Sequence, residues 1–176
     1  FFIPAISMSL IARERNLGTI ELINTMPIKI HEFVIGKYLA SVTLIVSGLA
    51  ITLVHFFTLM KVGTNIDFGA AICGYVGLAL VGAVYASAGT FASSVTDNQV
   101  VSFIIAVFIV IVFWLLDKML IFVPSGLAGL IQFMSVDYHF TNLSRGVIDT
   151  RNLIYFGSVI GFFLFLTHRL MEVRKW

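Results

Sequence analysis

The chain has 176 residues, of which 59% are hydrophobic and 11% are charged, and its formal net charge is +2. Soluble domains carry about a quarter of their residues as charged side chains, so this composition excludes an ordinary soluble domain and predicts a membrane protein. The small net charge gives no support for nucleic-acid binding. With three prolines and no low-complexity linker, we expect one all-α domain over residues 1–176, a polytopic helical bundle in the lipid bilayer.

Residues 1–12 are apolar, but they are too short to cross about 30 Å of hydrocarbon at about 1.5 Å per residue. We expect them to be the end of a span that meets the lipid headgroups at Arg13 and Arg15. The chain begins at Phe1 without a methionine, and it lacks the basic leader of a signal peptide. These features predict an N-terminally truncated chain whose first helix begins upstream.

Residues 13–32 interrupt the apolar sequence with acidic and basic side chains, between which several apolar residues remain. This pattern predicts a short helix that presses one side against another surface. Gly18 allows a turn, Thr19 is placed to cap the helix after it, and Pro27 ends or bends that helix. We interpret the segment as a coupling element that another protein moves.

Four longer segments are expected to span the membrane, namely residues 38–60, 68–93, 100–116 and 153–170. Between the second and third, Thr96 or Asp97 is placed to cap the third helix. Seven Lys and Arg residues lie on the side of the coupling element and the C-terminal tail, against four on the other side. The positive-inside rule therefore places the coupling element in the cytoplasm.

Residues 117–151 lie on the outer face in this topology, and their apolar pieces of about 10 residues or fewer predict interfacial or re-entrant helices. Arg145 and Asp149 are four residues apart and could pair on one helix face, while Asp149 or Thr150 could cap the last span. One interpretation of this polar cluster is an ion-paired helix cap. The other is an outer gate or substrate contact, whose candidates are Asp137, His139, Arg145 and Asp149.

The second predicted span is rich in Gly and Ala, and its small residues recur four apart, which makes a face that another helix can approach closely. The last span repeats this spacing with Gly157 and Gly161. We expect helix packing at Gly74, Gly82, Gly157 and Gly161, either within this chain or between subunits.

The sequence offers little for catalysis. No Gly-rich turn ends in Gly-Lys-Ser or Gly-Lys-Thr, so we expect no ATP bound by a phosphate loop. The histidines are far apart, which predicts no metal site, and no serine has an acid–base partner at a suggestive spacing. The predicted spans contain almost no charge, which disfavours an ion-coupled carrier. We expect a protein that is not an enzyme and has no cofactor of its own.

Three motifs resemble a known family. The run E-R-x-x-G-T-I-E-L-I-x-T-x-P-I at residues 14–28 is similar to the coupling segment of the membrane subunit of ABC-2 type (type V exporter-like) transporters. The strings FASSVTDNQ at residues 91–99 and YHF…SRGVIDTR…YF at residues 138–156 most resemble the permease associated with bacterial gliding motility. The resemblance covers nearly the whole chain.

The resemblance implies a six-span permease of the bacterial cytoplasmic membrane, lacking here its first span and most of its second. It implies a homo- or heterodimer with a second permease subunit, and cytosolic ABC ATPase subunits that bind ATP and Mg²⁺. It assigns to the ATPase-coupling motif Glu14, Gly18, Thr19, Glu21 and Pro27. Glu21 would make a polar contact to the ATPase, with Ile20 and Ile23 as hydrophobic anchors.

The permease interpretation has two alternatives. A channel or secondary carrier would transport without a bound ATPase, and a structural membrane anchor would keep its function beside ATPase-dead partners. The sequence does not indicate the substrate.

Overall fold

A computed structural model describes residues 1–21, 28–63, 67–119, 125–147 and 149–173. Its helices are α1 (Phe2–Ser7), α2 (Ala12–Asn16), α4 (Ile30–Val62), α5 (Phe68–Val95), α6 (Gln99–Met119), α7 (Ser125–Met134), α8 (Val136–Ser144) and α9 (Thr150–Val173). The described ranges contain no strand, which confirms the predicted all-α class.

Four helices are long and apolar enough to cross a membrane, namely α4, α5, α6 and α9, with 33, 28, 21 and 24 residues. About 20 residues span the hydrocarbon core, so the chain is a multi-pass membrane protein. Each predicted span lies within one of these helices. At about 1.5 Å per residue, α4 is longer than the core is thick, and its polar first turns extend beyond it.

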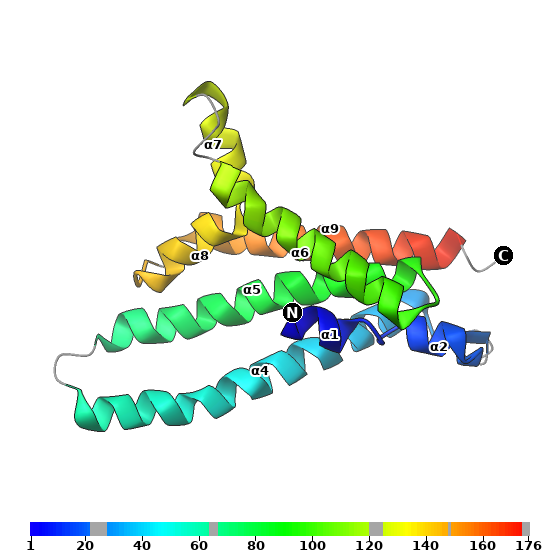
Figure 1. The fold of residues 1–176 in the computed structure, drawn as a ribbon, viewed down its shortest axis with the longest axis horizontal. Helices are drawn as coiled ribbons and strands as arrows, with labels where there is room; N and C mark the ends of the chain where they lie inside the picture. The colour runs from blue at the N-terminus through cyan, green and yellow to red at the C-terminus, as the bar shows by residue number, and fades with distance from the viewer. Residues whose placement is uncertain (22–27, 64–66, 120–124, 148, 174–176) are drawn as a thin grey trace.

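The bundle is organised around α5, which contacts α1, α2, α4, α6, α8 and α9 (Figure 1). The small residues of α5 allow these close approaches. A Cβ added at Gly82 would lie 2.8 Å from Ile45 Cγ2 of α4, and one at Gly89 would lie 1.8 Å from Ser7 Oγ of α1. The backbone of α5 therefore lies directly against its neighbours.

The other predicted packing glycines behave differently from Gly82. A Cβ added at Gly74, Gly157 or Gly161 would have nothing within 4 Å, because these residues lie on faces of α5 and α9 turned away from the bundle. Gly82 therefore packs within the chain as expected, whereas the other three do not. Packing of those three between subunits stays a prediction.

Two helix boundaries differ from the sequence expectation. Residues 1–12 do not end a single span, because α1 stops at Ser7 and α2 begins at Ala12 after a turn. At the start of α6 the cap is neither Thr96 nor Asp97, since Asn98 Oδ1 accepts the Val100 N–H at 2.9 Å. In both places the local sequence is compatible with more than one position for the helix end.

Gly89→Ala is expected to lower stability, because its Cβ would collide with Ser7 and force α1 away from α5. Overpacking of this kind costs about 1–3 kcal/mol. Gly74→Ala is the matched control on the same helix, where a Cβ meets open space. Fluorescence-detected thermal unfolding in detergent measures both, and equal melting temperatures for the two variants would contradict the close α1–α5 contact.

Candidate functional site

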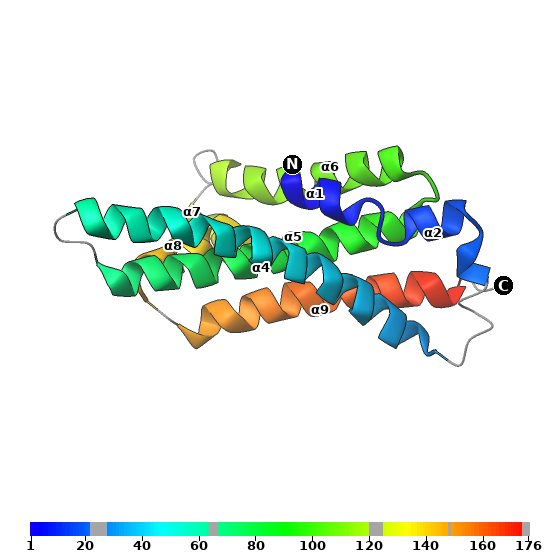
Figure 2. The same ribbon diagram turned by 90° about the horizontal axis from the view of Figure 1, so that it is seen from below.

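Most of the polar contacts between distant segments gather at one end of the bundle, which we call the α2 end. Here α2 contacts the end of α5 and the start of α6, and its side chains reach Lys37 of α4 and Met171 of α9. Figure 2 shows the ends of these helices gathered on one side of the molecule. At this end His31 of α4 stacks on His168 of α9 with ring centroids 6.3 Å apart. The described coupling residues, Glu14 and Gly18 to Glu21, therefore lie where all four long helices have an end.

Ser93 of α5 closes the break between α1 and α2. Its hydroxyl accepts the N–H groups of Ile11 at 3.0 Å and Ala12 at 2.9 Å, and it donates to the Met8 carbonyl at 3.0 Å. The first N–H groups of a helix have no partner within the helix, and the residue before α2, Ile11, provides no side-chain cap. The cap of α2 therefore comes from another helix.

Arg15 fastens α2 to two further elements. Its Nη1 donates to the Ser94 carbonyl at 2.8 Å and to Asp97 Oδ1 at 3.3 Å, and its Nη2 lies 3.2 Å from Met171 Sδ on α9. The Ser94 carbonyl is at the C-terminal end of α5, where unpaired carbonyls and the helix dipole favour a cation. Asp97 is 62% exposed, so its ion pair adds little and the carbonyl contact dominates.

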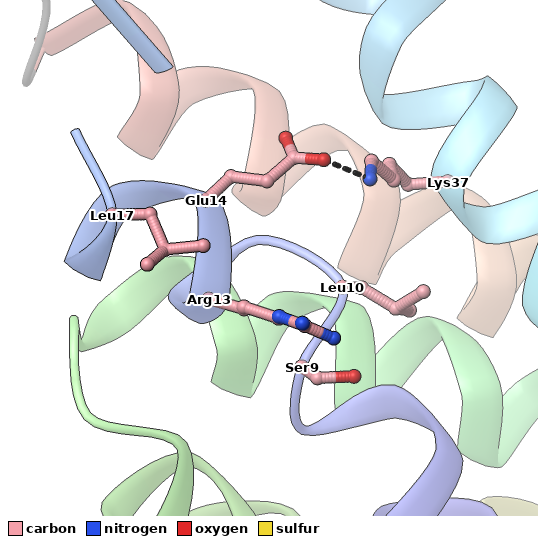
Figure 3. Close-up of a pocket in the computed structure, with 6 residues that line it drawn as sticks. All are labelled: Ser9, Leu10, Arg13, Glu14, Leu17 and Lys37. Atoms are coloured by element: carbon pink, nitrogen blue, oxygen red, sulfur yellow. Dashed lines mark hydrogen bonds and ion pairs between the residues drawn. The ribbon is translucent and has the colours of Figure 1, made fainter. Parts of the chain in front are cut away.

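The carboxylate of Glu14 points towards α4 (Figure 3). It pairs with Lys37 of α4 beside a cleft of about 380 Å³, and its Oε2 is buried with no hydrogen-bond partner among the residues that the structure describes. The cleft is lined by Ser9, Leu10, Arg13, Glu14, Leu17 and Lys37. The family resemblance assigns Glu14 to the ATPase-coupling motif, whereas the structure places it in a contact that holds α2 to α4.

The chain turns sharply after α2 at Gly18, whose φ of 71° lies in the left-handed region that favours glycine. The sequence predicts that Thr19 caps the helix after this turn. The backbone that Thr19 would cap lies partly outside the described residues, so that cap stays a prediction. The Thr19 hydroxyl donates to the Glu14 carbonyl at 3.1 Å and so closes the end of α2. The turn thus uses both residues to end α2.

The coupling residues differ in exposure. Glu21 is exposed, and so is Leu17, with 64% of its surface accessible. Ile20 packs beside the buried cluster of Ile11, Val34 and Met171, so part of this predicted anchor is used within the chain. Ile23 and Pro27 lie outside the described residues. Leu17 and Glu21 are therefore exposed next to the turn that ends α2, and the sequence pattern does not single out Leu17.

At the opposite end of the bundle, the gate candidate His139 is 2% exposed. Its Nδ1 lies 2.7 Å from Asn152 Oδ1 and its Nε2 lies 3.0 Å from the Phe133 carbonyl. Its ring stacks on Tyr155 with centroids 4.0 Å apart. His139 therefore joins α7, α8 and α9 inside the fold and does not face the outer surface.

The remaining gate candidates occupy separate positions. Asp137 lies 3.9 Å from Lys118 Nζ, which also pairs with Asp117 at 2.8 Å. Arg145 ends α8, and Asp149 caps α9 by accepting the Arg151 N–H at 2.9 Å.

The expected Arg145–Asp149 pair on one helix face is wrong. A turn at Gly146, with φ of 83°, separates the two residues, and the described part of the chain records no ion pair between them. Asp149 is a helix cap, as the simpler interpretation expects.

Comparison with known proteins gave one match. A family model described as ABC-2 family transporter protein matches residues 1–165, from α1 through most of α9. No match was found among curated proteins or among solved structures. The matched range includes the α2 end and the α7–α8 segment, so the family pattern covers both polar regions described above.

Arg15→Gln is expected to destabilise the protein, because it removes the charged donor from the Ser94 carbonyl and releases Met171. Hydrogen bonds to charged groups contribute about 1.5–3 kcal/mol. Arg13→Gln is the matched control, since Arg13 lies on the same helix and is exposed. Thermal unfolding of both variants measures the difference, and an equal loss would show that Arg15 does not fasten the α2 end.

Proposed function

Because the chain belongs to the ABC-2 family of transporter proteins, we propose that it is the membrane-spanning permease subunit of an ATP-driven exporter. The family makes it a permease component of an ABC transporter. In the proposal, ATP and Mg²⁺ bind to a separate cytosolic ATPase subunit, and this chain performs no catalysis. The observation that carries the proposal is the family match over residues 1–165, which includes the helix α2 that is tied to three spans.

The ATPase is proposed to dock on the exposed side of the α2 turn. Leu17 presents a large exposed apolar side chain, and the exposed Glu21 follows it four residues later in the chain. An apolar anchor beside a charged rim is typical of protein interfaces. Residues 13–32 thus supply the surface, while Glu14 and Arg15 hold it to the bundle.

In the proposed mechanism, ATP binding closes two partner ATPase subunits, and their movement displaces α2. The displacement reaches α4 through the Glu14–Lys37 pair, α5 through Ser93 and the Ser94 carbonyl, and α9 through Met171. The spans then tilt and open a path at the interface with a second permease subunit. The open faces at Gly157 and Gly161 support such an interface, since nothing in the described chain covers them.

The hydroxyl groups of α4 favour this proposal over a secondary carrier. They donate to carbonyls of their own helix at 2.6–2.8 Å, as found for Ser41, Thr43, Ser47, Thr52 and Thr58. A carrier path needs polar groups that are free to bind a solute or a coupling ion. Back-bonded hydroxyls instead satisfy themselves within the helix.

We place the permease in the bacterial cytoplasmic membrane, with the α2 end in the cytoplasm. The Lys and Arg excess on that side supports this topology. The motifs at residues 91–99 and 138–156 support a transporter of the gliding-motility kind.

The double variant Leu17→Ala, Glu21→Lys is expected to lose the copurifying ATPase when the protein is purified gently from its own cells. Loss of an anchor worth about 2 kcal/mol weakens binding roughly 30-fold. Gln132→Lys is the control, because it introduces a lysine at an exposed position on α7. Retention of a P-loop ATPase in near-equal amount by the double variant would place the docking surface elsewhere. No ATPase with the parent protein would contradict the coupled-permease proposal itself.

The topology is tested with single cysteines at Asn16 and Gln132, both exposed, in a Cys73→Ala background. An impermeant maleimide added to intact cells is expected to label Gln132→Cys and to spare Asn16→Cys until the membrane is permeabilised. The opposite pattern would show that the orientation is inverted.

A further inference from the structure

We infer that α5 carries a displacement of α2 across the membrane to α8, and that Ser93 is the positioning residue that ties α2 to α5. The inference rests on the proposed function for the source of the displacement, which is the ATPase. The route itself follows from three sets of contacts along α5, taken in order from the α2 end.

The first contact makes α2 and α5 move together. Ser93 supplies the hydrogen bonds that begin α2, so α2 cannot shift against α5 without leaving the Ile11 and Ala12 N–H groups unpaired. One turn earlier, the backbone of α5 at Gly89 lies against the side chain of Ser7 at the end of α1, with no room for a methyl group. A polar cap and a steric contact therefore act on the same stretch of α5.

The middle of α5 is suited to pass the motion on. It is a continuous helix without proline, and its buried hydroxyls at Ser87 and Thr90 bond back to carbonyls of the same helix at 2.7 and 2.8 Å. On the α5 side its contacts here use Gly and Ala, so side chains of the neighbouring helices, such as Ile45, pack directly against its backbone. Close-packed interiors of this kind transmit strain.

The far contact joins α5 to α8. A Cβ added at Gly77 would lie 3.1 Å from the Phe140 ring and 3.4 Å from Leu143 Cβ. Closer to the middle of the helix, Val84 packs with Val136 and Leu143 in a buried cluster. From Gly77 to Ser93 the helix rises about 24 Å at 1.5 Å per residue. The α2 end and α8 are thus linked by one rigid element across most of the hydrocarbon core.

α8 in turn is joined to its neighbours. The buried His139 of α8 contacts Asn152 of α9 and the Phe133 carbonyl of α7. When α8 is displaced, α7 should therefore move with it. A reporter on α8 should respond to nucleotide bound at the opposite end of the bundle.

The test uses two matched pairs in the complete transporter, reconstituted with its ATPase in lipid nanodiscs. Ser93→Ala removes the cap of α2, whereas the Ser94 hydroxyl bonds to the Phe91 carbonyl of its own helix, which makes Ser94→Ala the control. The valine side chain of Gly77→Val would push α8 away from α5. The valine side chain of Gly74→Val would begin in open space, which makes this variant the control. The reporter is Tyr138→Cys, at a position on α8 that is 37% exposed.

The measured quantity is the change in maleimide labelling rate at Tyr138→Cys on addition of a non-hydrolysable ATP analogue. We expect Ser93→Ala and Gly77→Val to reduce this change at least fivefold, with Ser94→Ala and Gly74→Val near the parent response. All four variants should retain the copurifying ATPase, which separates transmission from docking.

Equal responses within both pairs would overturn the inference, as would a parent reporter that does not respond to nucleotide. Loss of the ATPase in Ser93→Ala alone would mean that Ser93 shapes the docking surface and does not transmit motion. If Ser93→Ala fails to fold, the glycine pair decides. Absence of the ATPase from the parent complex would instead overturn the proposed function, and the route with it.

Discussion

The fold depends on the direct contact of the α5 backbone with its neighbours. Wherever α1, α4 or α8 crosses α5, a glycine removes the Cβ that would collide, at Gly89, Gly82 and Gly77 respectively. Lipid is as apolar as the side chains, so close packing and interhelical hydrogen bonds must hold such a bundle together. The glycines provide the first of these, and Ser93 provides the second at the point where α1 gives way to α2.

The two ends of the bundle use polar residues differently. At the α2 end, Arg15 and Glu14 make contacts between helices and leave Leu17 and Glu21 exposed, which suits a surface that is held firmly and touched from outside. At the opposite end, His139 is buried and its polar contacts join elements to one another. One end leaves side chains exposed, and at the other the polar contacts join neighbouring elements.

The spans, the polar segment between them and the helix cap at Asp149 were predictable, because hydropathy and capping are local properties of the sequence. The residue that caps α2 could not be predicted from the sequence. Ser93 lies 81 residues from Ala12, and no periodicity or spacing connects them. Gly157 and Gly161 show a different limit, since a small residue permits a close contact but does not reveal whether the neighbour belongs to this chain or to another subunit. The family resemblance predicts a coupling role for residues 13–32, yet only the tertiary contacts distinguish the ion-paired Glu14 from the exposed Glu21.

A cap supplied from another helix has a consequence for biosynthesis. A helix as short as α2, with five residues, is not stable by itself, and its capping hydroxyl is translated 81 residues after Ala12. At about 5–20 residues per second, that delay is roughly 4–16 s. During this interval α2 lacks its cap, so under the proposed function its docking surface forms only after α5 has been synthesised. The time at which α2 can be capped therefore depends on one hydroxyl group, that of Ser93.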